Sequence, residues 1–434
     1  MPSSSILPMP SGRDASVQSP PARVTRRYVG TRRRTLPPAG GSIPYRAIFA
    51  SIRQSVTVAR TEQSEELFRR LTAAIGPQCW ILTNSGRSAL SLVLMALHRQ
   101  RPQCEEVVIP AYTSYSVPAA VVRAGFRVRL CDIEPQTLGL DPNALARTIS
   151  DRTLCVVPHH LFGLPCRMAE ICDIAAGFGV PLVEDAAQGL GVRCGARNAG
   201  MFGDASIFSI SRGKNIPAAG GGLVGLHDKA LWEACRVLLH PDRGNPAQSM
   251  GLKPMLEALL MAWFIRPSRY WLPAALPFLQ LGASRFDPTF SVSPMTRFQQ
   301  ALFEHLLPTA QTLQEGRRAC AIRLRHALQR TQVKVLWPRD ADTGAYLRLP
   351  VLFPARGMKV RCLEELTRRG LGSTEGYPLP LSNVAPLRSF LSEPDVRFPV
   401  ADHVSDRLIT LPTHVWVTDR DIDVMAEVLA QCAS

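Results

Sequence analysis

A buried strand that ends in two acids, followed by a second strand and then a lysine, constrains the fold of this chain more than any other feature. The first strand is predicted in VPLVEDAAQGLG, where the apolar run ends at Glu184 and Asp185. The second is predicted in ASIFSIS and leads into RGKNIPAAGGGLVGL, in which Lys214 precedes a cluster of glycines. Short, continuous apolar runs are typical of strands that are covered on both faces. The sequence therefore predicts a carboxylate and an amine at the ends of two buried strands.

Strands and helices alternate through the first half of the chain. The predicted elements are a strand at 107–110, a helix over 117–124, strands at 128–133 and 153–163, and a helix over 167–178. Repeated units of this kind specify an open α/β sheet whose site lies at the C-terminal edge of the strands. The predicted fold is α/β, with a mostly parallel central sheet, helices on both faces and a smaller C-terminal α+β domain.

The length of 434 residues is enough for a large and a smaller domain, each with its own core. The Pro and Gly residues that follow Leu36 mark the expected start of ordered structure. The predicted divisions are a disordered basic arm over 1–35, a large domain over 36–249, an apolar helical insertion over 250–283 and a small α+β domain over 284–434.

Charge and cysteine content exclude several classes of protein. The net charge is +15, and the first 34 residues contain seven arginines but only one acid. This Ser/Pro-rich arm has no apolar core of the kind found in secretory signals, and it could contact a polyanion or an anionic membrane. No specific nucleic-acid contact is predicted. The eleven cysteines form no CxxC pair or Cys/His cluster, which argues against a metal site and for a reducing, cytoplasmic location.

A strand-end lysine and a buried carboxylate match the chemical needs of pyridoxal 5'-phosphate. The aldehyde of this cofactor needs an amine with which to bond, and its ring nitrogen needs an anion that keeps it protonated. A lone lysine at a strand end is more often an ordinary surface residue. The glycines and polar residues around Lys214 favour the cofactor interpretation.

The same stretch resembles the DegT/DnrJ/EryC1/StrS family of sugar aminotransferases. The resemblance rests on EDAAQGLG at 184–191, GMFGDASIFSISRGKN at 200–215 and GGGLVGL at 220–226. It implies the type I fold of aspartate aminotransferase, and outside the insertion it extends over about residues 36–432.

The resemblance implies a role for each matching residue. Lys214 would hold the cofactor covalently and move the proton, Asp185 would pair with the ring nitrogen, and Gln188 would lie near the oxygen side of the ring. Ser209 and the turn at Gly86, Arg87 and Ser88 would bind the phosphate, because that turn feeds a helix whose N-terminus attracts anions.

Several positions depart from the family pattern. Arg87 replaces a threonine, so it could itself pair with phosphate. Ser114 stands where the family has an aromatic residue that stacks on the ring, and we expect Tyr115 to supply that face. His160 aligns with a family histidine and is expected in the cofactor pocket, although it could be structural. No asparagine occupies the segment that reaches the partner subunit's phosphate, where Ser291 or Ser293 is nearest.

The insertion at 250–283 contains two broken apolar runs that are too short to span a bilayer. Two interpretations remain open. It forms a helical hairpin buried in a dimer or against the small domain, or residues 252–282 form a patch that contacts a membrane surface or a partner.

The reaction that the resemblance implies is transfer of an amino group, usually from glutamate, to a nucleotide-linked keto sugar, in polysaccharide, lipopolysaccharide or glycoside biosynthesis. A lysine at 214 favours transfer over dehydration, because the dehydratases of the family carry histidine there. A homodimer is expected by resemblance. Two alternatives are a non-catalytic regulatory or scaffold protein with this fold, and a pyridoxal-phosphate enzyme that acts on a non-sugar substrate.

Overall fold

The computed structural model describes residues 34–57, 60–76, 78–239, 250–276, 285–338 and 343–433. The basic arm predicted over 1–35 therefore lies outside the described residues, apart from its last two positions.

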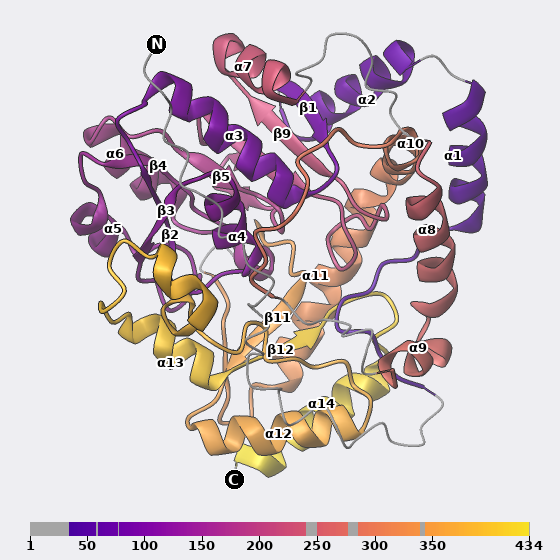
Figure 1. Ribbon diagram of the computed structural model, residues 1–434. Coiled ribbons are helices and arrows are strands. Elements are labelled where there is room, and N and C mark those ends of the chain that lie inside the picture. The colour runs from indigo at the N-terminus through magenta and orange to yellow at the C-terminus, as the bar shows by residue number, and fades with distance from the viewer. Residues whose placement is uncertain are drawn as a thin grey trace.

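A seven-stranded sheet forms the centre of the molecule (Figure 1). Isolated parallel bridges at Val156–Leu182 and His159–Asp185 join its two halves. The strands lie in the order β3 (Arg127–Cys131), β2 (Glu106–Pro110), β4 (Thr153–Val156), β5 (Val183–Asp185), β8 (Ala205–Ser209), β9 (Gly222–Leu226) and β1 (Cys79–Thr83). Only β9 runs against its neighbours in this sheet. The prediction of a mostly parallel central sheet is confirmed.

Helices cover both faces of this sheet, as the continuous apolar strands predicted. Val107 and Ile109 of β2 belong to the same core as α3 (Gly86–Gln100) and α4 (Ser116–Arg123). Val108, between them, points into a second core with α5 (Pro142–Thr148) and α6 (Met168–Gly177). Successive residues of a strand point to opposite faces, so the interior of a strand that is buried on both sides is apolar at successive positions, as in Val107, Val108 and Ile109.

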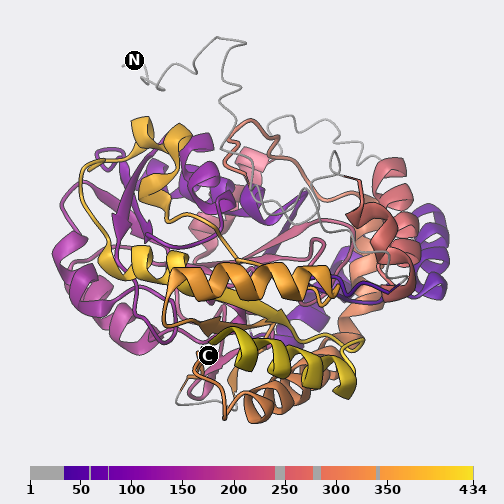
Figure 2. The same ribbon diagram turned by 90° about the horizontal axis from the view of Figure 1, so that it is seen from below.

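A second, antiparallel sheet occupies the C-terminal part of the chain. Its strands are β10 (Lys334–Val335), β11 (Arg348–Leu352) and β12 (Leu408–Pro412). Three helices lie beside it, α12 (Arg356–Arg368), α13 (Pro399–Arg407) and α14 (Asp419–Ala433). Figures 1 and 2 show α12 and α14 side by side, at the end of the molecule away from α3. The long helix α11 (Ala310–Ala327) leads from the central region to this sheet.

The insertion forms two helices, α8 (Leu252–Phe264) and α9 (Pro267–Ala274), and residues 277–284 lie outside the described part of the chain. Helix α8 packs on α1 (Tyr45–Thr57) and α10 (Arg297–Leu306) and buries Ala258 and Ala262 there. Its opposite face is exposed.

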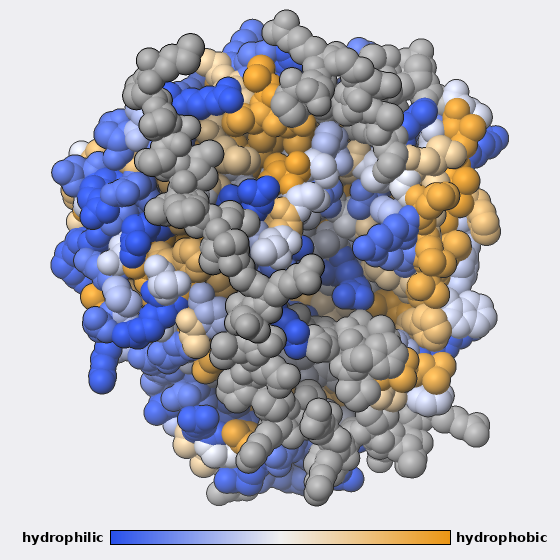
Figure 3. All heavy atoms as spheres, viewed as in Figure 1, coloured by the Kyte–Doolittle hydropathy of each residue, from blue (hydrophilic) through white to orange (hydrophobic). Residues whose placement is uncertain are grey.

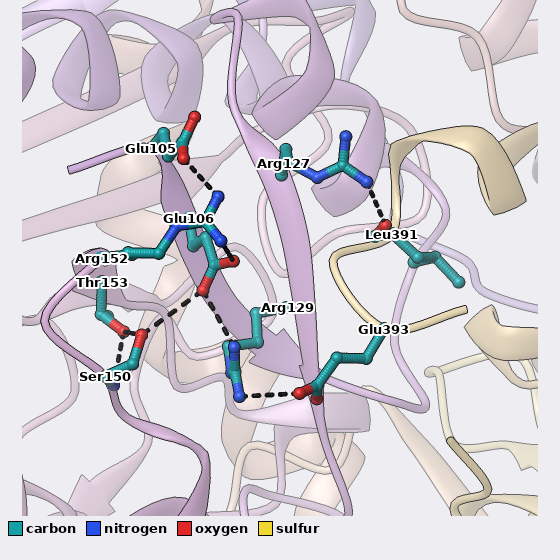
Figure 4. A network of polar contacts seen from close by, with 9 residues as sticks. All are labelled: Glu105, Glu106, Arg127, Arg129, Ser150, Arg152, Thr153, Leu391 and Glu393. Atoms are coloured by element: carbon teal, nitrogen blue, oxygen red, sulfur yellow. Dashed lines mark hydrogen bonds and ion pairs between the residues drawn. The ribbon is translucent and has the colours of Figure 1, made fainter. Parts of the chain in front are cut away.

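A buried ion-pair network ties the C-terminal part of the chain to the N-terminal end of β2 and β3 (Figure 4). The Glu106 carboxylate, which is almost fully buried, accepts a hydrogen bond from Arg129 at 3.0 Å. Arg129 also pairs with Glu393 at 3.0 Å, and the N–H of Ser392 donates to the carbonyl of Val128 at 2.9 Å. The segment around 392 therefore extends the sheet beside β3, at the edge opposite to the predicted site.

Candidate active site

Asp185 and Lys214 lie at the same edge of the sheet. Asp185 is the last residue of β5, which pairs in parallel with β8, and Lys214 follows β8 in a tight loop. The loop is fixed from α11 by Arg317, which is 2% exposed and donates to the carbonyls of Lys214, Asn215 and Gly40 at 3.1 to 3.3 Å. The buried guanidinium therefore holds the backbone that presents the lysine.

Burial and charge set the ionisation of the pair. Burial lowers the pKa of Lys214 to about 8, the charge of Asp185 opposes this, and the nearby charge of Arg348 adds to it. Burial raises the pKa of Asp185, whereas the N–H of Ala187, 3.0 Å from Oδ1, and the charge of Lys214 act in the other direction. A lysine with a pKa near 8 keeps a substantial fraction of neutral, nucleophilic amine at neutral pH.

Gln188 lies beside this pair and is held by two contacts. Its Oε1 accepts a hydrogen bond from the N–H of Phe162 at 3.1 Å, and its Nε2 donates to the hydroxyl of Tyr377 at 3.4 Å. The rings of Tyr377 and Phe162 stack, with centroids 6.1 Å apart and planes 16° apart. Tyr377 belongs to the GYPLPL loop, so a residue from the C-terminal part of the chain completes this side of the site.

The turn predicted to bind phosphate forms the N-terminus of α3. Ser85 caps this helix, with its Oγ accepting from the N–H of Ser88 at 3.3 Å. A Cβ on Gly86 would lie 2.8 Å from Cβ of Ser209, so glycine is needed for the helix to approach the end of β8 so closely. Gly86, Ser88 and Ser209 are thus brought together at one strand end.

Arg87, within this turn, contacts an aromatic ring. Its guanidinium carbon lies 4.5 Å from the centroid of the Phe290 ring, in a cation–π contact. Both residues line a cavity of about 600 Å³ that also includes Ser291 and Ser293. Asn84 donates to Ser291, and Ser88 Oγ donates to the carbonyl of Ser291 at 3.0 Å, so this segment packs on the helix N-terminus of its own chain.

Tyr115 and His160 are held by protein contacts. The hydroxyl of Tyr115 accepts from the N–H of Leu379 and donates to its carbonyl, each at 3.0 Å, and its ring lies 5.8 Å from that of Tyr377. The Nε2 of His160 lies 2.8 Å from the Glu184 carboxylate, and its Nδ1 accepts from the N–H of Cys166 at 3.3 Å. Neither ring nitrogen of His160 is left for a ligand, and the cofactor role suggested for both residues stays a prediction.

Several residues of the site were not predicted from the sequence. Arg348 begins β11 and lies near Lys214, while Tyr270, from α9 of the insertion, lies near the charges of Arg348 and Arg212. A usable signal existed for one of them, because Arg348 is the only charged residue in the run GAYLRLPVLF at 344–353.

The fold is the type I fold of the pyridoxal-phosphate-dependent transferases. The chain belongs to the DegT/DnrJ/EryC1/StrS aminotransferase family, whose profile matches residues 46–430. The family predicted from the sequence is confirmed, and with it the assignment of an aminotransferase.

Three relatives illustrate the similarity. The chain is 24% identical to the pleiotropic regulatory protein of Geobacillus stearothermophilus, over 75% of this chain and 78% of that protein. It is 34% identical to UDP-N-acetyl-3-dehydro-alpha-D-glucosamine 3-aminotransferase of Acidithiobacillus ferrooxidans, over 36% of this chain and 42% of that protein. A putative sugar aminotransferase from Streptococcus pneumoniae, solved in its PLP form, superposes with a TM-score of 0.72 at 18% identity, covering 92% of this chain and 98% of that one.

Proposed function

We propose that this chain is a pyridoxal-phosphate-dependent sugar aminotransferase, which moves an amino group from an amino acid, glutamate, to a nucleotide-linked keto sugar. The observation that carries the proposal is the partly buried Lys214 beside the buried carboxylate of Asp185, at the strand edge next to the N-terminus of α3. Membership of an aminotransferase family and the relatives named above support the choice of acceptor.

The residues at this edge fit the cofactor chemically. The amine of Lys214, with its lowered pKa, suits the aldehyde, and Asp185 suits a protonated ring nitrogen. Gly86 lets the start of α3 approach Ser209 closely, so the N-terminus of this helix, which attracts anions, lies at the same strand end as the Ser209 hydroxyl. When bound, the cofactor supplies an electron sink for the bond changes at the substrate carbon.

Each residue at this edge would then have its own role in the reaction. Lys214 would carry the proton at its Nζ between donor and acceptor positions, which its lowered pKa favours near neutral pH. Asp185 would hold the ring nitrogen and fix the ring in the cleft. Gln188 and Tyr377, linked at 3.4 Å, would support one side of the ring.

The test compares Lys214→Ala with Lys334→Ala, a matched change at the short strand β10. Each purified protein is incubated with pyridoxal phosphate, washed, and examined by absorbance and intact-mass spectrometry after borohydride reduction. The wild type and Lys334→Ala are expected to retain one covalently fixed cofactor, and Lys214→Ala none. Equal labelling of Lys214→Ala would refute the assignment. Conversion of bound cofactor by glutamate, followed by a panel of nucleotide keto sugars, then separates a sugar enzyme from a non-sugar or regulatory protein.

We also infer a homodimer in the cytoplasm. All eleven cysteines are unpaired, which suits a reducing compartment. The cavity beside Arg87 and Ser291 lies next to the proposed phosphate turn, where the family resemblance places a partner subunit. Sedimentation equilibrium tests this, and a monomer at micromolar concentration would contradict it.

A second proposal concerns the exposed face of α8, where the protein would rest on an anionic membrane surface. Leu252, Leu256, Leu260 and Trp263 recur on one side of the helix and are 77%, 58%, 48% and 50% exposed. Figure 3 shows hydrophobic side chains gathered along the edge of the molecule that α8 forms. No helix in the described ranges is long and apolar enough to cross a bilayer.

The charges around this stripe favour lipid as its occupant. Residues 250–276 contain Lys253, Arg266 and Arg269 but only one acid, Glu257. The Arg269 guanidinium lies 3.7 Å from the centroid of the Trp263 ring. Apolar side chains flanked by Arg and Lys, with a Trp among them, are typical of helices that lie in the membrane interface.

Flotation with phosphatidylserine-containing vesicles tests this proposal. Leu256→Asp with Leu260→Asp should lower the vesicle partition constant at least about 30-fold, because two half-exposed leucines contribute roughly 2 kcal/mol. The matched control is Val396→Asp, which alters a valine that is 44% exposed and lies far along the chain. If the double variant changes the oligomeric state and no form floats, the stripe joins two copies of this chain and the membrane proposal is wrong.

A further inference from the structure

The cavity between α3 and α8 is lined by two cations and a single acid. Its volume is about 600 Å³, which lies within the range of sites for small molecules. Arg87 comes from the first turn of α3, and Lys253 and Glu257 lie one turn apart on α8. Within the described ranges, neither Arg87 nor Lys253 forms an ion pair. Two cations against one acid leave the lining with an excess of one positive charge.

Three helices begin at this cavity. Ser85, which caps α3, lines it, and so does Thr296, which caps α10. Lys253 is the second residue of α8, and α8 and α10 lie side by side (Figure 1). A Cβ on Gly251, the N-cap of α8, would lie 2.7 Å from Oγ1 of Thr296, so glycine lets these two helix ends meet. The positive ends of the helix dipoles add to the charge of the side chains, and the cavity therefore favours an anion.

This cavity is separate from the turn proposed to hold the phosphate of the cofactor. Its lining contains none of the residues proposed to hold the cofactor at that turn and strand edge, which are Gly86, Ser88, Ser209, Lys214 and Asp185. It does contain Ala219 and Gly220, a few residues after Lys214, so the cavity adjoins the site without enclosing the reacting amine. Arg87 replaces a threonine of the family pattern, and Lys253 belongs to the insertion. The two cations are therefore features of this chain and not of the family motif.

We propose that this cavity binds the diphosphate that joins the keto sugar to its carrier, with Arg87 and Lys253 as its cations. The inference rests on the proposed function, because it places the carrier end of the acceptor in that site. A diphosphate is several bonds from any ketone of the sugar ring, so its subsite lies apart from Lys214, as this cavity does. Guanidinium and ammonium groups both bind phosphate oxygens.

Asn84 adds an acceptor to the same wall. Its Nδ2 donates to the carbonyl and to Oγ of Ser291, each at 3.2 Å, and Ser291 also lines the cavity. In the described part of the chain, the buried Oδ1 of Asn84 accepts no hydrogen bond. An acceptor without a donor is costly in a buried position, and a hydroxyl of the sugar or of its carrier would supply the missing donor.

Helix α8 connects this cavity with the exposed apolar stripe. Lys253 follows Leu252 and Glu257 follows Leu256, and successive residues of a helix lie about 100° apart around its axis. The polar face that lines the cavity therefore adjoins the stripe. Two carriers present the same diphosphate to such a subsite, a nucleotide from solution and a lipid in the membrane on which the stripe would rest.

The experiment titrates cofactor-loaded, borohydride-reduced protein with inorganic pyrophosphate in a calorimeter. The reduced cofactor occupies its own phosphate site, so the heat reports binding elsewhere. Lys253→Gln and Arg87→Gln should each raise the dissociation constant at least about tenfold, because each removes a charged donor. Glu257→Gln should lower the dissociation constant about threefold, because it removes the acid. The control Lys334→Gln, an exposed change in β10, should leave it unaltered.

The opposite signs distinguish binding from a structural effect. Lys253 and Glu257 are exposed residues of one helix, so damage to α8 would shift both affinities in the same direction. Equal affinity of all variants, or no heat with the wild type, would overturn the inference. It would also be wrong if Arg87→Gln changed the oligomeric state in sedimentation and left pyrophosphate binding unaltered, because a partner subunit would then fill the cavity.

A second titration separates the two carriers. Uridine diphosphate represents the nucleotide, and farnesyl diphosphate in phosphatidylcholine vesicles represents the lipid. The carrier whose diphosphate binds more tightly than pyrophosphate, and is weakened by Lys253→Gln, is the one that the subsite accepts. Preference for farnesyl diphosphate would support this inference and replace the nucleotide in the proposed function. If Lys253→Gln weakened neither ligand, the subsite assignment would be wrong.

The inference and the proposed function fail in different ways. A wild-type protein that takes up no pyridoxal phosphate contradicts the proposed function, and pyrophosphate titration of the protein as purified still tests the cavity. A wild-type protein with a working glutamate half-reaction but no diphosphate binding contradicts this inference alone.

Discussion

Replacing Glu106 tests whether the buried ion-pair network at the N-terminal end of β2 stabilises the fold. The side chain of Glu106 is 2% exposed and that of its partner Arg129 is 17% exposed, whereas Glu393, on the other side of Arg129, is 47% exposed. Figure 4 shows that Arg152 and Ser150 approach the same carboxylate. The change Glu106→Gln keeps the shape of the side chain and removes the charge that these groups surround.

The expected cost follows from burial. Removing one partner of a buried ion pair costs about 3–5 kcal/mol. Because Arg129 keeps Glu393 as a partner, we expect the lower end of that range for Glu106→Gln, about 3 kcal/mol. An unfolding entropy of roughly 2.1 cal/mol/K per residue gives about 0.9 kcal/mol/K for 434 residues, so the melting temperature should fall by about 3 °C.

The matched control is Glu393→Gln, which removes the exposed partner of the same arginine. Exposed ion pairs contribute about 0–1 kcal/mol, so its melting temperature should fall by no more than about 1 °C. Differential scanning calorimetry of both variants and the wild type gives the comparison. Equal shifts for Glu106→Gln and Glu393→Gln would refute the argument from burial. Because the network lies at the edge of the sheet opposite to Lys214, each folded variant should keep its capacity to bind pyridoxal phosphate.

Three further predictions concern the site. Capture of pyridoxal phosphate should accelerate as the pH rises through about 8, because the pKa of Lys214 is lowered to about 8 in the folded protein. The unfolded lysine keeps its proton to higher pH, so this group destabilises the fold below about pH 8, and the destabilisation should fade between about pH 8 and pH 10. Melting curves of wild type and Lys214→Met across that range measure the effect. Gly86→Ala should weaken pyridoxal phosphate binding at least about tenfold in equilibrium dialysis, because the added Cβ would lie 2.8 Å from Cβ of Ser209. The control Gly177→Ala should bind normally, because no atom lies within 4 Å of its added Cβ. Arg317→Met should lower both the melting temperature and the affinity for pyridoxal phosphate, because three backbone carbonyls in and beside the Lys214 loop lose their hydrogen-bond donor. If neither quantity changes, the role given to Arg317 is wrong.

The local sequence was sufficient to predict those features of the fold and the site whose residues lie in one stretch of the chain. Residues 180–183, which precede Glu184 and Asp185, are all apolar because this part of the chain lies inside the sheet. The helix predicted over 117–124 is α4, Ser116–Arg123. The end of β8 near Lys214 could be placed beside Asp185 because parallel strands bring their carboxyl ends to one edge. These features depend on contacts between elements close in the chain or on a family motif.

Residues that reach the site from far along the chain could not be found in this way. Tyr377 meets Gln188 across 189 positions, and the electrostatic contact of Arg348 with Lys214 depends on how β11 is placed against the central sheet. No periodicity in a single segment contains that information. The orientation of α8 is a similar case, since its run LKPMLEALLMAWF is apolar on nearly every side, and only packing on α1 shows which leucines remain outside.

The position of the insertion determines how its role must be tested. Its outer helix α8 presents Leu256 and Leu260 to solvent, whereas α9 places Tyr270 near the charge of Arg348, so one segment forms the exposed stripe and also approaches the proposed active site. Deleting residues 252–282 would remove both features and would also uncover the part of α1 on which α8 packs. Substitutions on the outer face of α8 leave Tyr270 in place, so Leu256→Asp with Leu260→Asp should lose vesicle binding and keep the half-saturating glutamate concentration of the wild type. Tyr270→Phe should do the reverse, because it changes a hydroxyl near Arg348 and no exposed leucine. If both variants lost both properties, the stripe and the active site would not be separate, and the insertion would act as a single structural support for the site.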